Sequence, residues 1–275
     1  MYKVITSSSN KLYKHIKSLS IKSNRDKNGE FIIEGIHLVE DALKARAPVR
    51  SIVVSESFIK KEEHKNVLGA LLDLKLPIYQ FPDRLFKEAA QTETPQGILG
   101  IVSVQSIVVE DILLRDKGSP LLIFCDSVQD PGNVGTIIRT ADAAGADGVI
   151  LSKGCVDVYN PKTVRSTMGS LFHIPIVKVE DSIKTLEYLK QRGIRIISSE
   201  LGSRMYYFEV NMEEGVVIVI GNEAKGVSKE VSGMADYHVK IPMCGGAESL
   251  NAGIASGILI YEAVRQRLGK NLSVK

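Results

Sequence analysis

DPGNVGTIIRTADAAG, residues 130–145, sets the architecture expected for the second half of this chain. It follows LLIFCD (121–126), an apolar run that predicts a buried strand ending in a carboxylate. Its own apolar positions recur at helical spacing and predict one buried side, made of Val134, Ile137, Ile138 and Ala141. The turn between strand and helix lacks the G-x-G-x-x-G spacing of a dinucleotide site, so a different ligand is expected there.

Two polar residues of this helix are candidate functional groups. Asn133 is placed to cap the helix, because a side-chain oxygen there accepts a bond from a free backbone N–H. Arg139 lies six residues further on, about 9 Å along the axis and roughly 120° around it. Helical side chains lean toward the N-terminus, so Arg139 is expected to reach back toward Asn133. A helix cap and a solvent-facing arginine without function are the simpler alternative.

The composition excludes several classes of protein. A hydrophobic content of 44% with 24% charged residues is typical of a globular protein and not of a disordered one. No apolar run approaches the ~18–20 residues that span a bilayer, and the polar N-terminus is no secretory signal. Cys125, Cys155 and Cys244 form no C-x-x-C pair, which argues against a disulfide framework or a zinc site. We therefore expect a cytoplasmic protein with no membrane and no metal.

Positive charge is concentrated at the N-terminus. Residues 1–30 carry six Lys and one Arg against two acidic residues, a net charge of +5, whereas the whole chain is only +3. A basic segment on a nearly neutral body suits a polyanion partner and predicts binding that weakens with salt. A solvated helix that merely aids solubility is the alternative.

Strands and helices alternate in two blocks, which predicts an α/β protein. The first block contains the strand-like segments EFIIEG, RSIVVS, LPIYQF and QGILGIVSV and predicts a small parallel or mixed sheet. Residues 105–120 lose the pattern and end in Gly-Ser-Pro. We predict a first domain over residues 1–106, a linker over 107–120 and a second domain over 121–275.

Six strand-like segments linked mostly by helices predict a parallel sheet in the second block, covered on both faces. They are residues 121–126, 147–151, 174–179, 194–200, 216–221 and 238–243. Ligands of such sheets bind beyond the carboxyl ends of the strands. That rule selects three loops, at 126–133, 221–227 and 242–251. A long last helix follows, from about Leu250 to Leu268, with small residues that allow another backbone to pack closely.

The second and third loops also carry polar groups. Gly221 and Gly226 permit close backbone approach or positive φ, and Glu223 projects a charge from the end of a strand. Ser249 stands near the start of the last helix, where it is placed to act as its N-cap. Taken singly, each loop is also compatible with an ordinary polar turn.

Together the three loops resemble the SpoU/TrmH-type RNA 2′-O-ribose methyltransferases of the SPOUT superfamily. Their ordered motifs match N-x-G-x-x-x-R at 133–139, G-N-E-x-x-G at 221–226 and I-P-M…E-S-L-N at 241–251. FIIEG (31–35) and TPQGI (94–98) look like the L30e-like substrate-binding domain of the ribosomal RNA members. The resemblance therefore covers nearly the whole chain.

The resemblance implies a C-terminal parallel sheet with a deep trefoil knot, a small N-terminal L30e-like α/β domain, and a homodimer formed through the C-terminal domain. It also implies an S-adenosylmethionine site, with Gly221, Ile241 and Leu250 as the expected cofactor contacts. The expected catalytic residues are Asn133, Arg139, Glu223, Ser249 and Asn251. The expected RNA backbone contacts are Lys11, Lys14, Lys17, Lys22 and Arg25.

Chemistry assigns these catalytic residues different roles. A guanidinium is effectively always protonated, so Arg139 is expected to clamp an RNA phosphate and donate toward the 2′-oxygen, with Asn133 orienting it. Glu223 and Ser249 would complete a proton path or hold the ribose, and Asn251 would support its loop. For Gly221, a Cβ is expected to obstruct an adenosyl group.

The predicted activity is S-adenosylmethionine-dependent 2′-O-ribose methylation of RNA. Ribosomal RNA, 23S in particular, is favoured because of the N-terminal domain. Two alternatives keep the fold: a transfer RNA 2′-O-methyltransferase, and an RNA-binding protein without catalytic activity. A Rossmann-like oxidoreductase is the rival from another class, and the missing G-x-G-x-x-G weakens it.

Overall fold

The computed structural model describes residues 2–74, 76–114 and 118–269, which form two compact units. Unit 1 holds Met1–Gln105 and Asp157–Phe172, and unit 2 holds Ser106–Val156 and His173–Lys275. Unit 1 thus includes residues 157–172, which lie inside the predicted second domain. The prediction treated each domain as one continuous stretch, so it did not include a segment that leaves one domain and packs in the other.

The segment predicted as a linker, residues 107–120, is partly structured. It contains helix α7 (Val109–Leu113), whose Val109 and Ile112 are buried in a hydrophobic cluster of unit 2. Residues 115–117 lie outside the described residues. At least the first part of the predicted linker therefore belongs to unit 2.

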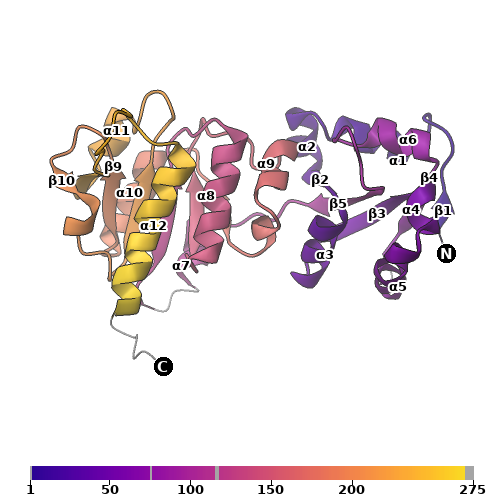
Figure 1. Cartoon of the computed structure of the whole chain (residues 1–275), viewed down its shortest axis with the longest axis horizontal. Helices are drawn as coiled ribbons and strands as arrows, with labels where there is room; N and C mark the ends of the chain where they lie inside the picture. The colour runs from indigo at the N-terminus through magenta and orange to yellow at the C-terminus, as the bar shows by residue number, and fades with distance from the viewer. Residues whose placement is uncertain (1, 75, 115–117, 270–275) are drawn as a thin grey trace. The chain divides into compact units, whose positions relative to one another are not determined.

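Unit 1 is built on a five-stranded mixed sheet in the order β1-β4-β3-β5-β2 (Figure 1). Its strands are β1 (Lys3–Val4), β2 (Glu30–Glu34), β3 (Val49–Ser55), β4 (Ile78–Phe81) and β5 (Ile98–Ser103). Strands β1, β4 and β3 run parallel, whereas β5 is antiparallel to both β3 and β2. The four strands predicted in this block are confirmed. The two-residue β1 is too short to leave a pattern in the sequence.

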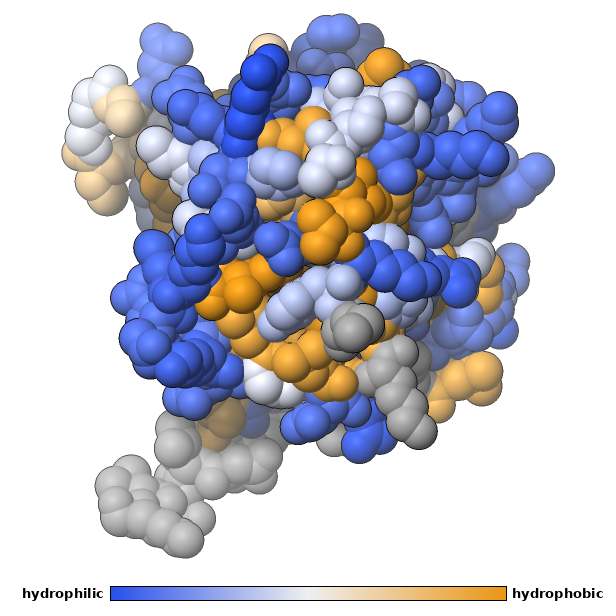
Figure 2. Space-filling view, turned by 90° about the vertical axis from the view of Figure 1, so that its right-hand side faces the viewer, coloured by the Kyte–Doolittle hydropathy of each residue, from blue (hydrophilic) through white to orange (hydrophobic). Residues whose placement is uncertain are grey.

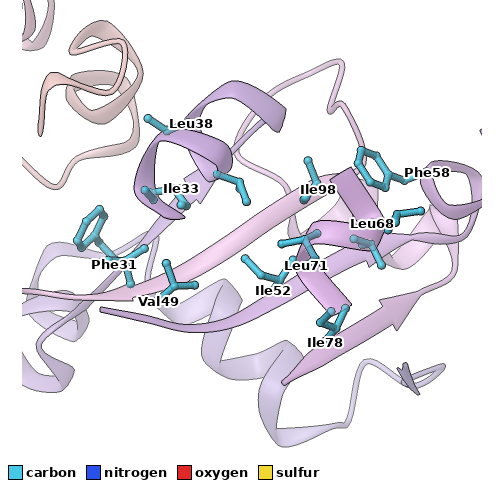
Figure 3. Packing of buried hydrophobic residues seen from close by; sticks show 14 of the residues in the cluster. Phe31, Ile33, Leu38, Val49, Ile52, Phe58, Leu68, Leu71, Ile78 and Ile98 are labelled. Atoms are coloured by element: carbon cyan, nitrogen blue, oxygen red, sulfur yellow. The ribbon is translucent and has the colours of Figure 1, made fainter. Parts of the chain in front are cut away.

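Helices cover both faces of this sheet. They are α1 (Lys11–Ser18), α2 (Lys22–Asn28), α3 (Ile36–Lys44), α4 (Glu56–Lys60), α5 (Lys65–Asp73), α6 (Asp83–Ala89) and α9 (Pro161–Ser166), with short 3₁₀ turns at Glu62–His64 and Ser170–Phe172. Successive strand residues point to opposite faces, so Ile32 and Ile33 enter different hydrophobic clusters. Figure 3 shows the cluster on the Ile33 side, where Phe58 and Leu68 pack toward the strands.

The basic N-terminal segment is part of this folded unit and not a free arm. Tyr13, Ile16 and Leu19 recur at helical spacing and are buried in the cluster on the second face. Unit 1 also leaves some apolar side chains exposed, among them Val4 and Leu72. Figure 2 shows an apolar area within the otherwise hydrophilic end face of the unit.

Unit 2 is built on a seven-stranded, fully parallel sheet in the order β10-β12-β9-β11-β6-β7-β8. Its strands are β6 (Leu121–Cys125), β7 (Gly148–Leu151), β8 (Ile176–Lys178), β9 (Arg195–Ser199), β10 (Met205–Tyr206), β11 (Val216–Ile220) and β12 (Tyr237–Lys240). The predicted parallel sheet and its six strands are confirmed, and β10 is an additional short edge strand. Central strands such as β6 and β11 are continuous apolar runs because both of their faces are covered.

The helices of unit 2 form a layer on each face of the sheet. They are α7, α8 (Pro131–Ala143), α10 (Ser182–Gln191), α11 (Lys229–Ser232) and α12 (Ala252–Gly269), with a 3₁₀ turn at Tyr207–Glu209. Side chains of α7, α10 and α11 share one hydrophobic cluster with the strands. Helices α8 and α12 pack side by side (Figure 1). This arrangement brings the loop before α12 next to the loop before α8.

Candidate active site

A cavity of about 640 Å³ opens at the carboxyl ends of β9, β11 and β12 in unit 2. This is the edge at which open parallel sheets bind ligands, and the volume is typical of a small-molecule site. Six of the residues predicted from the motifs line it: Gly221, Glu223, Ile241, Ser249, Leu250 and Asn251. Two of the three predicted loops therefore meet in one cavity.

The third predicted loop, 126–133, reaches this site through hydrogen bonds. Asn222 Nδ2 donates to the carbonyl oxygen of Ser127 (2.8 Å), and its Oδ1 accepts from the backbone N–H groups of Ala224 and Lys225 (3.0 and 3.1 Å). Asn222 thus shapes its own loop and ties it to the loop before α8. Sequence reasoning missed this residue, although it stands inside the second motif.

Asn133 does not cap α8, contrary to the expectation. The N-cap is Asp130, whose carboxylate accepts the backbone N–H of Asn133 (2.9 Å), and Pro131 follows at the first helical position. Proline is favoured there because its φ suits the first turn and it needs no partner for an N–H. Asn133 lies within that first turn and is buried. Because Asp130 is the cap, the side-chain amide of Asn133 can form hydrogen bonds with residues outside the helix.

That amide joins the three motifs. Asn133 Nδ2 donates to Glu223 Oε1 (2.9 Å), and Asn133 Oδ1 accepts from Asn251 Nδ2 (2.8 Å). Asn251 Oδ1 in turn accepts the backbone N–H of Gly253 (2.9 Å) at the start of α12. Asn251, and not Ser249, therefore caps the last helix. Ser249 is exposed at the cavity wall.

Glu223 is held as a carboxylate over the N-terminus of α8. Besides Asn133, it accepts the backbone N–H groups of Gln129 (3.1 Å) and Asp130 (3.0 Å). Burial by itself raises the pKa of Glu223, but the hydrogen bond from Asn133 and those from the backbone outweigh it and lower the pKa below its ordinary value. An ionised, fully engaged carboxylate holds its neighbours in place and is a poor proton acceptor.

Gly221 is required by its own loop. A Cβ at this position would overlap the backbone of Gly226 and Val227, since Asn222 and Gly226 exchange two backbone hydrogen bonds of 2.9 Å. The sequence did not predict this contact, and the obstruction of an adenosyl group by a Cβ stays a prediction. Glycine lets the loop fold back on the end of β11.

Arg139 lies on the exposed side of α8 and does not reach Asn133. Among the residues that the structure describes, it has no hydrogen-bond or ion-pair partner, and it does not line the cavity. The side chain of Arg139 therefore does not extend back toward Asn133 as expected. The guanidinium is left open to a partner from outside.

Two charged residues of the cavity were missed by sequence reasoning. Glu200 follows β9, and its carboxylate bonds to Ser198 Oγ (2.6 Å) and His238 Nδ1 (3.0 Å), while Lys240 ends β12. Lys240 lies within the predicted strand 238–243 and left no signal, whereas the charge of Glu200 at the end of the predicted strand 194–200 was an available one. It was missed because the loop after β9 carries none of the three motifs.

The basic residues predicted to contact RNA divide into two kinds. Lys11, Lys14, Lys17 and Lys22 are exposed on α1 and α2. Arg25 is only 3% exposed; its guanidinium bonds to Asp157 Oδ2 (2.6 and 3.0 Å) and to the carbonyls of Leu19 and Ser20 (both 2.8 Å). Its prediction as an RNA contact was therefore wrong: all of its bonds are structural.

The described part of the chain offers neither a metal site nor a membrane span. Within residues 2–74, 76–114 and 118–269, no group of three or more His, Cys, Asp or Glu side chains could hold a metal ion. The same described residues include no helix that is long and apolar enough to cross a membrane. The three cysteines are free thiols.

Comparison with known families matches both blocks. Residues 120–261 match the SpoU rRNA Methylase family, and residues 10–100 match the MRM3-like substrate binding domain. The chain is 37% identical to the 23S rRNA (guanosine(2553)-2′-O)-methyltransferase RlmP of Bacillus subtilis, with 94% of this chain and 98% of the relative covered. It is 31% identical to the 23S rRNA (uridine(2479)-2′-O)-methyltransferase of Streptomyces viridochromogenes, covering 91% and 88%.

Solved structures agree with these matches. The SpoU methyltransferase AviRb of Streptomyces viridochromogenes, in complex with AdoMet, superposes with a TM-score of 0.86 at 30% identity, covering 94% of this chain and 98% of that one. An AdoMet-bound rRNA methyltransferase from Sinorhizobium meliloti gives 0.85 at 31% identity, covering 97% and 98%. Both superpositions extend over both blocks of the chain.

Proposed function

This chain belongs to the SpoU rRNA methylase family of S-adenosylmethionine-dependent RNA 2′-O-methyltransferases, and on that basis we propose that it methylates a ribose 2′-oxygen of 23S ribosomal RNA. The observation that carries the proposal is the chain of hydrogen bonds from Glu223 through Asn133 to Asn251, which joins all three motifs beside one cavity. A cytoplasmic location is part of the proposal, because 23S ribosomal RNA is made and assembled in the cytoplasm of a bacterial cell.

The cavity suits S-adenosylmethionine. Gly221, Ile241 and Leu250 line it with backbone groups and apolar side chains, as an adenosyl group requires, and Glu200 and Lys240 offer opposite charges to an amino acid end. When bound, the cofactor supplies a methyl group activated by its sulfonium. The residues of the chain have to align the ribose oxygen with that methyl group and accept one proton.

The protein groups divide this work. The exposed Arg139 guanidinium clamps a phosphate of the RNA outside the cavity, since it has no partner among the described residues and does not line the cavity. The hydroxyl of Ser249, at the cavity wall, forms a hydrogen bond with the ribose 2′-hydroxyl, and the proton that the 2′-oxygen loses passes through it to water. The two cavity loops, 221–227 and 242–251, are held to the start of α8 by hydrogen bonds of Asn133 with Glu223 and Asn251. We assign this role to Glu223 in place of the expected proton path.

Labelled methyl transfer tests the activity. The full chain should transfer methyl groups from S-adenosylmethionine to 23S ribosomal RNA that lacks the modification, and the product should contain one alkali-resistant linkage. Bulk transfer RNA is the parallel substrate. Transfer to transfer RNA alone would support the alternative substrate, and cofactor binding without any transfer would support an RNA-binding protein that has lost catalysis.

The two units are proposed to have different ligands. Unit 1, which matches a substrate-binding family, engages the RNA through Lys11, Lys14, Lys17 and Lys22, and unit 2 binds the cofactor.

We also propose that the chain of unit 2 is knotted: α12 follows the cavity loop and lies against α8. Stretching the unfolded chain between its ends should give a contour length shorter than the full chain by the length held in the knot.

Homodimerisation through unit 2 is the further part of this proposal. Helix α12 exposes Ile254, Tyr261 and Leu268, which are seven residues apart and so lie along one side of the helix. An exposed apolar line of this kind favours a protein partner. Sedimentation should give a dimer for the natural chain and a monomer for Tyr261→Glu, whereas a monomeric natural chain would contradict the proposal.

A further inference from the structure

A second cavity, of about 340 Å³, lies wholly within unit 1. Three stretches of chain line it: the end of β2 with the start of α3, the loop before β5, and the end of α9 with the turn after it. The first two stretches carry FIIEG and TPQGI, two motifs whose residues do not line the cavity of unit 2. The third stretch comes from residues 157–172.

The walls of this cavity are held by hydrogen bonds. Gln96 Oε1 accepts the backbone N–H of Ile36 (2.9 Å), and Glu34 accepts from the backbone N–H of Gln91 (2.7 Å) and from Thr92 Oγ1. Gly35, at φ 105°, admits this contact, since a Cβ there would press on Gln96 Oε1. The cavity is therefore a built feature of the fold.

Two half-buried charges of opposite sign face the cavity without meeting. Asp41 and Arg165 both line it, and neither side chain forms a hydrogen bond or ion pair with any residue that the structure describes. Leaving such charges partly desolvated and unpaired is unfavourable. Gly169 leaves space for the side chain of Asp41, because a Cβ at position 169 would collide with the Asp41 carboxylate. A ligand that accepts on one side and donates on the other would satisfy both charges.

Two apolar side chains, Met168 and Leu38, also line the cavity. Met168 is 62% exposed and has φ 48°, a left-handed conformation that is uncommon for a residue with a side chain and marks functional sites when it persists. Leu38, which is buried in the core cluster of Figure 3, also lines the cavity. A thioether and a leucine suit the flat face of an aromatic ring.

We propose that this cavity binds an unpaired guanine of the RNA substrate, at a nucleotide other than the one methylated. Guanine alone among the four bases offers the acceptors O6 and N7 on one edge, which match Arg165, and adjacent N–H donors on another, which match Asp41. A free phosphate is disfavoured by the carboxylates of Asp41 and Glu34. The inference rests on the proposed function, because it assumes an RNA substrate.

Short oligonucleotides test it with the full-length chain. Fluorescent uridine hexamers carry one central guanine, inosine, 7-deazaguanine or adenine, so that the 2-amino donor and the N7 acceptor are removed separately. The natural chain should bind the guanine hexamer about tenfold more tightly than the inosine, 7-deazaguanine or adenine hexamer. Asp41→Asn should abolish the preference over inosine, and Arg165→Gln the preference over 7-deazaguanine. Asp73→Asn and Arg84→Gln, on exposed parts of the same unit, should keep both preferences.

The outcomes separate this inference from the proposed function. Equal binding of the four hexamers, or a preference that survives both cavity variants, overturns the guanine site. Methyl transfer to 23S ribosomal RNA is measured on the same preparations. Transfer without a guanine preference refutes the inference alone, and absence of transfer by the natural chain refutes the proposed function. If Asp41→Asn fails to fold, as judged by its melting curve, Arg165→Gln alone decides the test.

Discussion

Asn133 illustrates how much a single side chain contributes to this site. Its amide donates to a carboxylate and accepts from another amide, and no carboxylate or hydrophobic residue could do both. The motif predicted that Asn133 matters, but the role predicted from helix chemistry was wrong. The cap is Asp130, three residues earlier, and only the contacts of the folded chain distinguish the two.

Arg139→Ala should nearly abolish methyl transfer, with a loss of about a hundredfold or more, because the guanidinium is proposed to hold the RNA and not the cofactor. Isothermal titration should find the S-adenosylmethionine affinity within a few-fold of the natural chain. Arg192→Ala, an exposed arginine at the end of α10, is the matched control and should retain activity. A large loss of cofactor binding by Arg139→Ala would refute the clamp.

Glu223→Gln should destabilise unit 2 in a pH-dependent manner. The folded pKa of Glu223 is lowered, so its contribution is complete above the ordinary value of 4.5 and is lost as pH falls through the folded pKa. At pH 7 the variant should be less stable by about 1 kcal/mol, a modest figure because the carboxylate is open to water. Urea denaturation at a series of pH values should show the difference shrinking below about pH 4.5. A difference that stays constant with pH would contradict this account.

The packing of α12 against α8 shows how an element depends on small residues. An added Cβ at Gly253 would lie 3.0 Å from Thr136 of α8, whereas at Gly257 the nearest atom of Thr140 is 3.7 Å away. The sequence predicted close packing against some backbone, and the structure identifies α8 of the same chain as the neighbour. The cavity loop depends on this contact, since Asn251 caps α12 beside Asn133.

Gly253→Ala and Gly257→Ala form a matched pair of variants on α12. Alanine favours a helix over glycine by about 1 kcal/mol, so Gly257→Ala should be neutral or stabilising. Gly253→Ala should be less stable than Gly257→Ala by about 1–3 kcal/mol, because Thr136 has to move. Chemical denaturation midpoints give the comparison, and equal midpoints would mean that α8 adapts freely.

The N-terminal helices combine a structural face with a charged one. Tyr13, Ile16 and Leu19 are core residues, so deleting residues 1–30 would remove part of unit 1 along with its charge. Replacing Lys11, Lys14, Lys17 and Lys22 by Gln should instead leave the fold intact. It should weaken RNA binding and reduce the salt slope by about 0.7–0.9 for each phosphate that is no longer neutralised. Replacement of Lys60, Lys61 and Lys65 in the same unit is the control, and an unchanged slope in the fourfold variant would assign these lysines to solubility alone.

At the level of the whole molecule, a buried ion pair holds a segment of the central chain in unit 1. Arg25 and Asp157 are 132 residues apart, and their side chains are only 3% and 5% exposed. Asp157 begins the segment that ends at Phe172, and this segment also supplies Val164 to the core of unit 1. The pair thus helps to hold Arg165 and Met168 at the second cavity.

Arg25→Met should cost about 3–5 kcal/mol of stability, because it removes the guanidinium that pairs with the buried carboxylate of Asp157. The double variant Arg25→Met with Asp157→Leu should recover part of that loss. Hydrogen exchange of unit 1 and a double-mutant cycle measure the effect. Additive losses in the two single variants would show that the pair is not coupled.

The amino-acid sequence was sufficient for every strand except the short β1 and β10, for most helices, for the parallel sheet of unit 2 and for the loops that carry the motifs. These features depend on alternation, helical periodicity and turn residues, all of which act over a few neighbouring positions. The tertiary structure was needed for the cap at Asp130, the burial of Arg25, the isolation of Arg139 and the placement of residues 157–172. Each of these depends on contacts between residues far apart in the chain, such as the bonds of Asn133 across 90 and 118 positions, which form only when the two layers of helices pack on the sheet.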